Sequence, residues 1–394
     1  MNINDFKIIR ITKWILFYVL SPFVRLEYKI WNKFAKKKKV IRFFSTSGNI
    51  SLVNILSIIN EIGNFDKYED FLFIDTGKGR KKFIENQMEI ASLHNFKKIY
   101  IGYQTNSGIT AVLNNFFKVD EVYLLNHYAH LKTVLKLYTN AKIKLIDEGP
   151  ASLINFGIEN IKNLKEIKTH KYIGKLDFYG LNNIKKYNFS KININEFNKI
   201  CKILSNRYPI DINCNNNEKY ILYCGIYWEV SGLNKEEFSQ IQKKVIQDLL
   251  DKGYKILYKP HPRDNDFYGF DRNPNVKFIN SKFPIEIYDL DVVAIVSISS
   301  TSSLTPAHYR SIPCFSHVTE NAINHADRNG GNLDIVRLIV KEYSPDYSIL
   351  LNFDVINTPK KELKEELNKY YQIFIKTKPL LSENKKIGEK WKIH

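Results

Sequence analysis

The chain has 394 residues, of which 59 are Lys or Arg and 41 are Asp or Glu, so its formal net charge is +18. At about 150 residues per domain, this length predicts two or three domains. The 25 Phe and 24 Tyr exclude a wholly disordered chain, and the 17 Gly and 12 Pro exclude a collagen-like one. The four cysteines lack C-x-x-C and zinc-ligand spacing, which excludes a disulfide scaffold and favours a reducing compartment.

The N-terminal segment, residues 1–39, combines aromatic side chains with cations. Residues 8–34 read IIRITKWILFYVLSPFVRLEYKIWNKF, and four lysines follow at 36–39. The longest uncharged stretch, 14–24, is about half of the 20 residues that a membrane-spanning helix needs. No small-residue cleavage site follows it, so a signal peptide is not expected. The pattern predicts an interfacial helix that binds anionic lipid, and a helix packed on its own domain is the alternative.

The positive charge implies attraction to an anion, such as nucleic acid, anionic lipid or acidic polysaccharide. No RNA-binding sheet signature, zinc finger or basic heptad region is present, so nucleic acid is not an expected partner. The lysines are also spread along the whole chain, which equally fits simple solvation.

From residue 40 onward, short β-rich runs alternate with helical patterns, which predicts parallel sheets with crossover helices. Helices are expected over 51–62 and 109–119 in the first half. Between 157 and 217 the sequence becomes polar and rich in Lys and Asn, and a domain boundary is expected at its end. The expected strands of the first half are 40–45, 71–75, 98–102, 121–125 and 142–146.

A second α/β set begins at residue 220. Asn234 followed by Glu237 predicts a capped helix start, and apolar side chains at Phe238, Ile241, Val245 and Leu249 form one helical face. Another helix is expected after Leu304. The expected strands are 220–224, 255–258, 276–279 and 292–297. The sequence thus predicts Rossmann-like domains at 40–215 and 216–380, and a C-terminal helix at 381–394 that packs back on the N-terminal domain.

Several common catalytic motifs are absent. No G-x-G-x-x-G follows a strand, residues 75–79 lack the spacing of a P-loop, and neither G-x-S-x-G nor H-E-x-x-H occurs. Two D-x-D strings, at 264–266 and 289–291, have a form that can hold a divalent cation. Such short strings arise often by chance, so no metal site is expected.

Three clusters follow predicted strands, at the edge where Rossmann sheets bind ligands. In the first, an apolar strand ends at the adjacent carboxylates Asp147 and Glu148. Repulsion between them and an apolar wall would raise one pKa toward the range of a general base. A solvated strand end explains the same residues equally well.

The second cluster is YKPHPR at 258–263. Pro260 and Pro262 restrict the backbone around His261, and a cation lies on each side of it. This setting suits a histidine that binds a phosphate and passes a proton to it. The third cluster, SISSTSS at 297–303, offers hydroxyls and free backbone N–H groups at a helix start, which suit an anion site or ordinary helix capping.

In this order, the clusters resemble motifs of the bacterial sialyltransferases, and most closely of the capsular α-2,8-polysialyltransferase family. The resemblance extends over about residues 40–320, and the basic N-terminus is similar too. The matching pieces are KLIDEG (144–149), YILYCGIYW (220–228), LYKPHPRD (257–264) and SSTSSL (299–304).

The resemblance implies a GT-B fold, in which two Rossmann-like domains face each other across a cleft. It also implies CMP-sialic acid as donor, inversion at the anomeric carbon, and no metal or other cofactor. Glu148, or else Asp147, would deprotonate the acceptor hydroxyl, and His261 would bind the departing phosphate and is the candidate to protonate it. Further donor contacts are expected from Lys259, Pro262, Ser300, Thr301, Ser302 and Ser303, with the choice among the hydroxyls open.

Acceptor contacts are expected from Lys78, Gly48 and Asn49. The acceptor is expected to be an anionic glycan and the product a polysialic acid capsule. The enzyme would lie in the cytoplasm, peripherally on the inner face of the membrane, in contact with capsule biosynthesis and export proteins. The alternatives are a transferase that adds one sialic acid to lipooligosaccharide, a transferase of another CMP-activated acidic sugar, and a non-enzymatic protein that binds anions.

Overall fold

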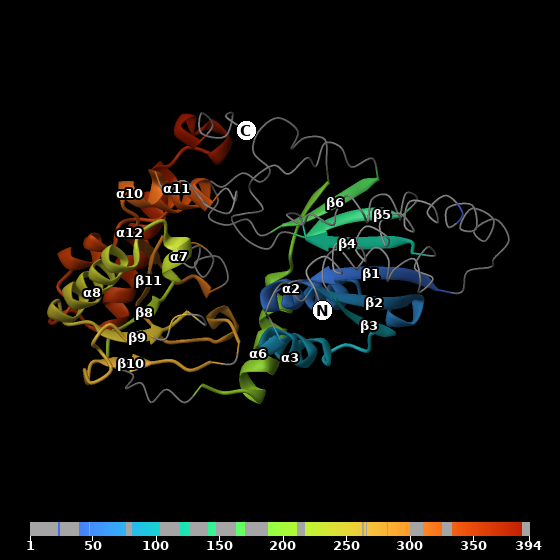
Figure 1. The fold of residues 1–394 in the computed structure, drawn as a ribbon, viewed down its shortest axis with the longest axis horizontal. Coiled ribbons are helices and arrows are strands. Elements are labelled where there is room, and N and C mark those ends of the chain that lie inside the picture. Colours follow the sequence, from blue (N-terminus) through green and yellow to red (C-terminus); the bar gives the residue numbers. More distant parts are fainter. Residues whose placement is uncertain are drawn as a thin grey trace, which may run out of the picture. The chain divides into compact units, whose positions relative to one another are not determined.

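The computed structural model describes residues 23, 39–46, 48–75, 81–102, 119–125, 141–146, 163–169, 188–210, 217–261, 264, 266–281, 283–299, 304, 310–324 and 333–387. In these ranges the fold is of the α/β class, with two parallel sheets (Figure 1). The expected helix at 109–119 and the segment 1–39 fall outside them, apart from Val119, Phe23 and Lys39. No helix in these ranges is long and apolar enough to cross a membrane.

The chain separates into two compact units. Unit 1 comprises Met1–Glu148, Asn155–Thr169 and Asn183–Ile200, and unit 2 comprises Gly149–Ile154, His170–Asn182 and Cys201–His394. The division between their last segments falls inside one helix, whereas composition pointed to residue 216. The domain limits expected from the sequence stay predictions.

Unit 1 contains a seven-stranded sheet in the order β3-β2-β1-β4-β5-β6-β7, with every pair parallel. This is a Rossmann arrangement, in which the strand order reverses between β1 and β4. The strands are β1 (Val40–Thr46), β2 (Tyr68–Asp75), β3 (Lys98–Gly102), β4 (Glu121–Leu125), β5 (Lys142–Ile146), β6 (Leu164–Thr169) and β7 (Phe189–Lys191). The helical elements are α2 (Asn49–Ile62), η1 (Phe65–Lys67), α3 (Lys81–Ala91) and the first half of α6 (Ile194–Arg207), which continues into unit 2 from Cys201.

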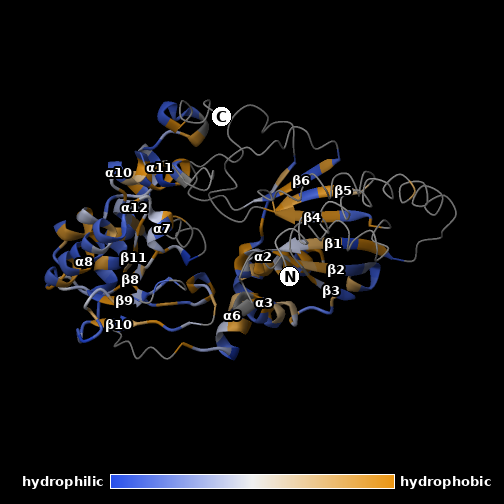
Figure 2. Cartoon of the chain, in the orientation of Figure 1, coloured by the Kyte–Doolittle hydropathy of each residue, from blue (hydrophilic) through white to orange (hydrophobic). Residues whose placement is uncertain are grey.

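The central strands of unit 1 form because their side chains are apolar on both faces, as in parallel sheets covered by helices. Within β4, residues 122–125 are buried, and in α2 so are all residues from Ser51 to Ile59. Figure 2 shows the hydrophobic colour along β4 and β5. This core fixes the carboxyl ends of β1, β4 and β5 at one edge of the sheet.

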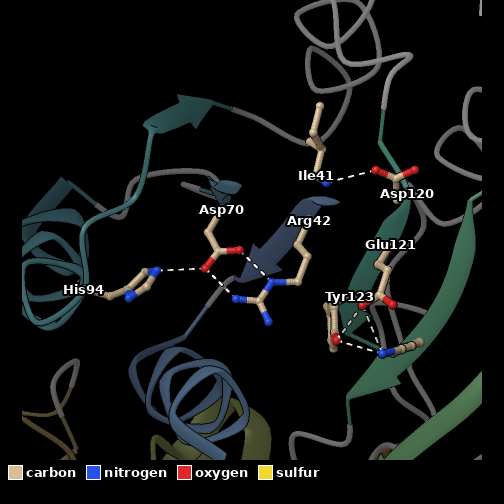
Figure 3. A network of polar contacts seen from close by, with 8 residues as sticks. Ile41, Arg42, Asp70, His94, Asp120, Glu121 and Tyr123 are labelled. Carbon is tan, nitrogen blue, oxygen red and sulfur yellow. Dashed lines mark hydrogen bonds and ion pairs between the residues drawn. The ribbon is translucent and has the colours of Figure 1, made fainter. Parts of the chain in front are cut away.

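A charged cluster lies near the amino ends of β1 and β2, away from the carboxyl edge at which Rossmann sheets bind ligands (Figure 3). The fully buried Arg42 of β1 donates from Nε and Nη2 to the two carboxylate oxygens of Asp70 in β2, over 2.6 and 2.7 Å. Nε2 of His94, which follows α3, lies 2.8 Å from Oδ2 of Asp70. Burial acts to raise the pKa of Asp70, but hydrogen bonds from His94 and Arg42 and their charges outweigh it and hold that pKa below its usual value. The cluster thus joins three neighbouring elements.

Unit 2 contains a five-stranded sheet in the order β10-β9-β8-β11-β12, again all parallel. Its order reverses between β8 and β11, so this sheet is also Rossmann-like. The strands are β8 (Tyr220–Cys224), β9 (Lys255–Lys259), β10 (Val276–Phe278), β11 (Ala294–Ile298) and β12 (Cys314–His317). The helical elements are α7 (Trp228–Ser231), α8 (Lys235–Asp251), η6 (Ile285–Ile287), α10 (Glu320–Asn324), α11 (Leu333–Tyr343), η8 (Tyr347–Asn352), α12 (Lys360–Thr377) and η9 (Leu381–Glu383).

The start of α8 confirms the capping prediction. The side chain of Asn234 accepts a hydrogen bond from the backbone N–H of Glu237 over 2.8 Å. Phe238, Val245 and Leu249 of the predicted apolar face are buried, whereas Ile241 is only partly so.

The C-terminal segment from residue 381 was expected to pack on the N-terminal domain as a helix. In its described part, Asn384 donates to the Tyr343 hydroxyl over 3.4 Å, and Nζ of Lys386 lies 3.4 Å from a carboxylate oxygen of Glu342. Both partners lie on α11 in unit 2. Packing on the N-terminal domain stays a prediction for residues 388–394.

Candidate active site

In unit 2, the candidate site lies at the carboxyl edge of the sheet, beside the reversal of strand order between β8 and β11. Cys224 ends β8, Lys259 ends β9 and Ile298 ends β11, and the register pairs Cys224 with both Lys259 and Ser297. The loops after these three strands therefore leave the same edge as neighbours. In Rossmann sheets this is where ligands bind.

His261 lies two residues beyond β9 and is partly exposed. Its ring stacks on Tyr227, which follows β8, with centroids 5.9 Å apart and an angle of 19° between the ring planes. Its backbone carbonyl accepts a hydrogen bond from the N–H of Asp264 over 2.9 Å. The predicted phosphate-binding histidine is thus held at the predicted edge of the sheet.

Gly225 permits this arrangement by letting two backbones approach each other. Its N–H donates to the carbonyl of Lys259 over 2.9 Å. A Cβ atom at this position would lie 3.2 Å from the backbone nitrogen of His261, 3.2 Å from the carbonyl of Lys259 and 3.0 Å from the hydroxyl of Tyr258. The loop after β8 is therefore closely packed against the loop after β9.

Lys259 ends β9 two residues before His261, and its side chain is partly buried. Nζ donates to the carbonyl of Pro260 over 3.2 Å. Burial lowers the pKa of Lys259, and the negative charge of Glu286 acts against that shift. Burial likewise raises the pKa of Glu286, while the charge of Lys259 acts to lower it. A cation that has lost part of its hydration is suited to bind an anionic ligand at this edge.

Ser299 is the last residue of the serine-rich cluster before the part that the structure does not describe. It is 4% exposed, and its φ of 51° lies in the left-handed region, which is unfavourable for a residue with a Cβ. Its N–H donates to the carbonyl of His317 over 3.2 Å, whereas its hydroxyl has no hydrogen-bond partner in the described ranges. Such backbone strain concentrates at functional sites.

In unit 1, the corresponding edge carries the turn from β1 into α2. Gly48 is the N-cap of α2, and the hydroxyl of Ser51 accepts from the Gly48 N–H over 3.2 Å and donates to its carbonyl over 2.8 Å. The Thr46 and Ser51 hydroxyl oxygens lie 2.7 Å apart. Asn49 is 7% exposed, and its Oδ1 has no hydrogen-bond partner among the described residues. The structure thus places Gly48 and Asn49 at the predicted edge.

The remaining predicted site residues lie outside the described ranges: Lys78, Asp147, Glu148, Pro262, Ser300, Thr301, Ser302 and Ser303. β5 does end at the buried Ile146, directly before the two carboxylates. Tyr227 and Ser299 were not chosen as site residues from the sequence. Tyr227 lies within the matching piece YILYCGIYW, and Ser299 begins SSTSSL. The resemblance therefore marked both segments, but it did not identify these two residues within them.

In the described parts of the two D-x-D strings, aspartate side chains contact other side chains of the same unit. Asp264 accepts from the Tyr268 hydroxyl over 2.5 Å, and Asp291 pairs with Lys360 over 2.6 Å. In the described part of the chain, no group of three or more His, Cys, Asp or Glu side chains is arranged to hold a metal ion.

The family model described as Alpha-2,8-polysialyltransferase (POLYST) matches residues 16–319. No curated protein matches the chain. Among solved structures, it is similar to the sialyltransferase from Photobacterium damsela, at 14% identity and a TM-score of 0.45, over 78% of this chain and 81% of that one. It is also similar to UDP-GlcNAc 2-epimerase from Neisseria meningitidis bound to UDP-GlcNAc, at 12% identity and a TM-score of 0.46, over 90% of this chain and 98% of that one. A third similar structure is MurG from Acinetobacter baumannii, at 10% identity and a TM-score of 0.44, over 90% of this chain and 100% of that one.

The family match extends over more than half of the chain and includes all four matching motif pieces. It agrees with the two Rossmann-like sheets, which are the components of a GT-B-type fold. The chain therefore belongs to the alpha-2,8-polysialyltransferase (POLYST) family and is a glycosyltransferase of the sialyltransferase class.

Proposed function

We propose that the protein transfers sialic acid from CMP-sialic acid to an anionic glycan, with inversion at the anomeric carbon and without a metal, in the synthesis of a polysialic acid capsule. The observation that carries the proposal is the position of His261. It lies at the carboxyl edge of the unit 2 sheet, stacked on Tyr227 and two residues beyond the partly buried Lys259, which ends β9. A histidine and a cation at this edge suit a leaving group with one phosphate.

In the proposed reaction, Glu148 or Asp147 removes the proton from the acceptor hydroxyl as its oxygen attacks the anomeric carbon. The bond between that carbon and the phosphate oxygen breaks, and CMP leaves with the electron pair. His261 donates a hydrogen bond or its proton to the departing phosphate. Lys259 and hydroxyls of the serine-rich loop stabilise the remaining charge. A monophosphate needs less charge neutralisation than a diphosphate, so these groups suffice without a metal ion.

The net charge of +18 supports an acidic acceptor, since one small donor does not require it. A growing polysialic acid carries one carboxylate per sugar. Lys78, Gly48 and Asn49 are proposed to contact it from unit 1. The segment 1–39 is proposed to hold the enzyme on the cytoplasmic face of the membrane through anionic lipid, near the capsule synthesis and export proteins.

The test is incubation of the purified enzyme with CMP-sialic acid, first alone and then with acceptors. We expect slow release of CMP from the donor alone and faster release with a sialylated oligosaccharide. A matched neutral galactoside should accelerate release less. Absence of CMP release under all three conditions would contradict the donor assignment.

Added salt is expected to weaken the binding of the acceptor more than the binding of the donor. The Debye length falls from about 10 Å at 0.1 M to about 3 Å at 1 M, which screens the attraction between dispersed cations and a polyanion. The KM for the acceptor should therefore rise steeply with salt, while the donor KM, held by directed hydrogen bonds, rises less. Lys78→Ala should raise the acceptor KM selectively. Equal salt dependence for both substrates would instead favour single addition to a neutral acceptor.

Ser299→Ala is expected to impair donor binding without loss of stability. The hydroxyl of Ser299 is buried and lacks a hydrogen-bond partner in the described structure, so its removal should leave the melting temperature unchanged or slightly higher. A hydroxyl that binds the donor phosphate contributes about 1 kcal/mol or more, so the donor KM should rise about 5- to 10-fold. Ser316→Ala serves as the control, because Ser316 is also a buried serine but lies in strand β12, outside the serine-rich cluster. An unchanged donor KM for Ser299→Ala would remove Ser299 from the site.

A further inference from the structure

We propose that Tyr227 is a positioning residue for His261: its ring fixes the imidazole so that a ring nitrogen meets the departing phosphate. This inference rests on the proposed function, because it assumes that His261 acts on the leaving group. Tyr227 itself would touch neither the phosphate nor the anomeric carbon.

The contact between the two rings suits this role. The planes are nearly parallel, at 19°, with centroids 5.9 Å apart, which is an offset stack. Stacking engages the face of the imidazole, whereas its two nitrogens lie in the ring plane. Tyr227 can therefore restrict the rotation of His261 and leave the edge of the ring to other partners.

Tyr227 is a firm support because its own loop is anchored on both sides. On the N-terminal side, the Gly225 N–H donates to the Lys259 carbonyl, and a Cβ atom on Gly225 would lie only 3.0–3.2 Å from its neighbours. On the C-terminal side, the short helix α7 is tied down by Arg337 of α11, a side chain that is 2% exposed. Nη2 of Arg337 donates to the carbonyl of Val230 over 2.7 Å.

Arg337 also joins α7 to α10. Nη1 donates to the carbonyl of Ala322 over 3.2 Å. Gly232, at the end of α7, has a φ of 82°, and a Cβ atom there would lie 2.9 Å from the guanidinium carbon of Arg337. A buried guanidinium that bonds to backbone carbonyls leaves α7 little freedom to move. The support for His261 therefore extends from β8 through α7 to the helices behind it.

The side chain of Tyr227 can be changed without removing a helix cap. Tyr227 is the N-cap of α7, but its side chain makes no capping hydrogen bond. Tyr227→Leu removes the aromatic face and keeps an apolar side chain, and Tyr227→Phe keeps the face and removes the hydroxyl. Tyr370→Leu on α12 is the matched control, since Tyr370 is also partly buried and packs in a ring contact with Phe353.

We expect Tyr227→Leu to lower kcat about 10-fold with the donor KM nearly unchanged, since an aromatic pair of this kind restricts orientation by about that factor. Tyr227→Phe should retain wild-type kcat, and Tyr370→Leu should too. In the His261→Ala background, adding Tyr227→Leu should cause no further loss, because a positioning residue acts through the group that it positions.

Three outcomes would overturn the inference even if His261→Ala is slow. The first is wild-type kcat in Tyr227→Leu while His261→Ala is slow, which leaves the proposed function intact. The second is a rise in donor KM at constant kcat, which would indicate that Tyr227 contacts the donor directly. The third is an equal loss in both backgrounds. If His261→Ala itself keeps wild-type kcat, the proposed role of His261 fails, and the inference fails with it.

Discussion

His261→Ala is expected to lower kcat by about 10²-fold or more. General acid–base groups contribute on this scale, and removing the imidazole also removes a hydrogen-bond donor to the developing phosphate charge. The effect should appear in kcat for both transfer and donor hydrolysis, because CMP departs in each. Steady-state CMP release at saturating donor measures it directly.

The control for this variant is His317→Ala. His317 ends β12 at the same edge of the sheet, and its Nδ1 lies 3.1 Å from Oδ2 of Asp346, so it has a structural partner of its own. Its substitution should leave kcat within about threefold of the wild type, as for a histidine outside the acid–base step. Comparable losses in both variants would mean that the His261 effect reflects general damage to the edge.

Arg42→Met is expected to destabilise the protein by about 3–5 kcal/mol. The guanidinium of Arg42 and the carboxylate of Asp70 are both buried, and removing Arg42 leaves the buried carboxylate with His94 as its remaining side-chain partner among the described residues. Denaturant unfolding at pH 7 measures the loss. Lys199→Ala is the control, because the Lys199–Glu196 pair has the same 2.6 Å distance but a side chain that is 67% exposed, and such pairs contribute about 0–1 kcal/mol.

The cluster of Arg42, Asp70 and His94 should also make the stability of the protein depend on pH. The pKa of Asp70 is lowered in the folded protein, so its ionised form stabilises the fold above the unfolded-state pKa of about 4. This stabilisation is lost as the pH falls through the lower folded-state pKa. Asp70→Asn should therefore be less stable at pH 7 and lose less stability below pH 4. A parallel loss in the wild type and Asp70→Asn would show that the cluster is not the cause.

The central strands could be predicted from sequence because burial on both faces leaves a continuous apolar run. The expected ranges 121–125, 142–146 and 220–224 agree with β4, β5 and β8, and the range 98–102 agrees with the edge strand β3. β6 and β7, the last two strands in the order of the sheet, were missed because they are polar: in LKEIKT of β6, Lys165 and Glu166 are not buried. The four-residue β12 is too short to show a period. Polar or very short strands form through pairing with neighbouring strands, which composition does not reveal.

The site was predictable where a motif restricts its own backbone, and less so where contacts are made between distant segments. Pro260 and Pro262 marked His261 directly. Tyr227 and His261 are 34 residues apart in the sequence, and they come together because β8 and β9 are adjacent strands of the sheet. The sequence alone therefore did not mark Tyr227 as a partner of His261. Ser299 likewise was one serine among several until its backbone angle and burial distinguished it.

The most direct test of the account is analysis of the product formed from CMP-sialic acid and an α-2,8-linked sialic acid oligosaccharide, in buffer containing a chelator. We predict stepwise elongation of the oligosaccharide by chromatography, new α-2,8 linkages by NMR, and a matching amount of released CMP. His261→Ala should reduce all three together. An acceptor that remains unextended while a neutral galactoside gains a single sialic acid would contradict the proposed function.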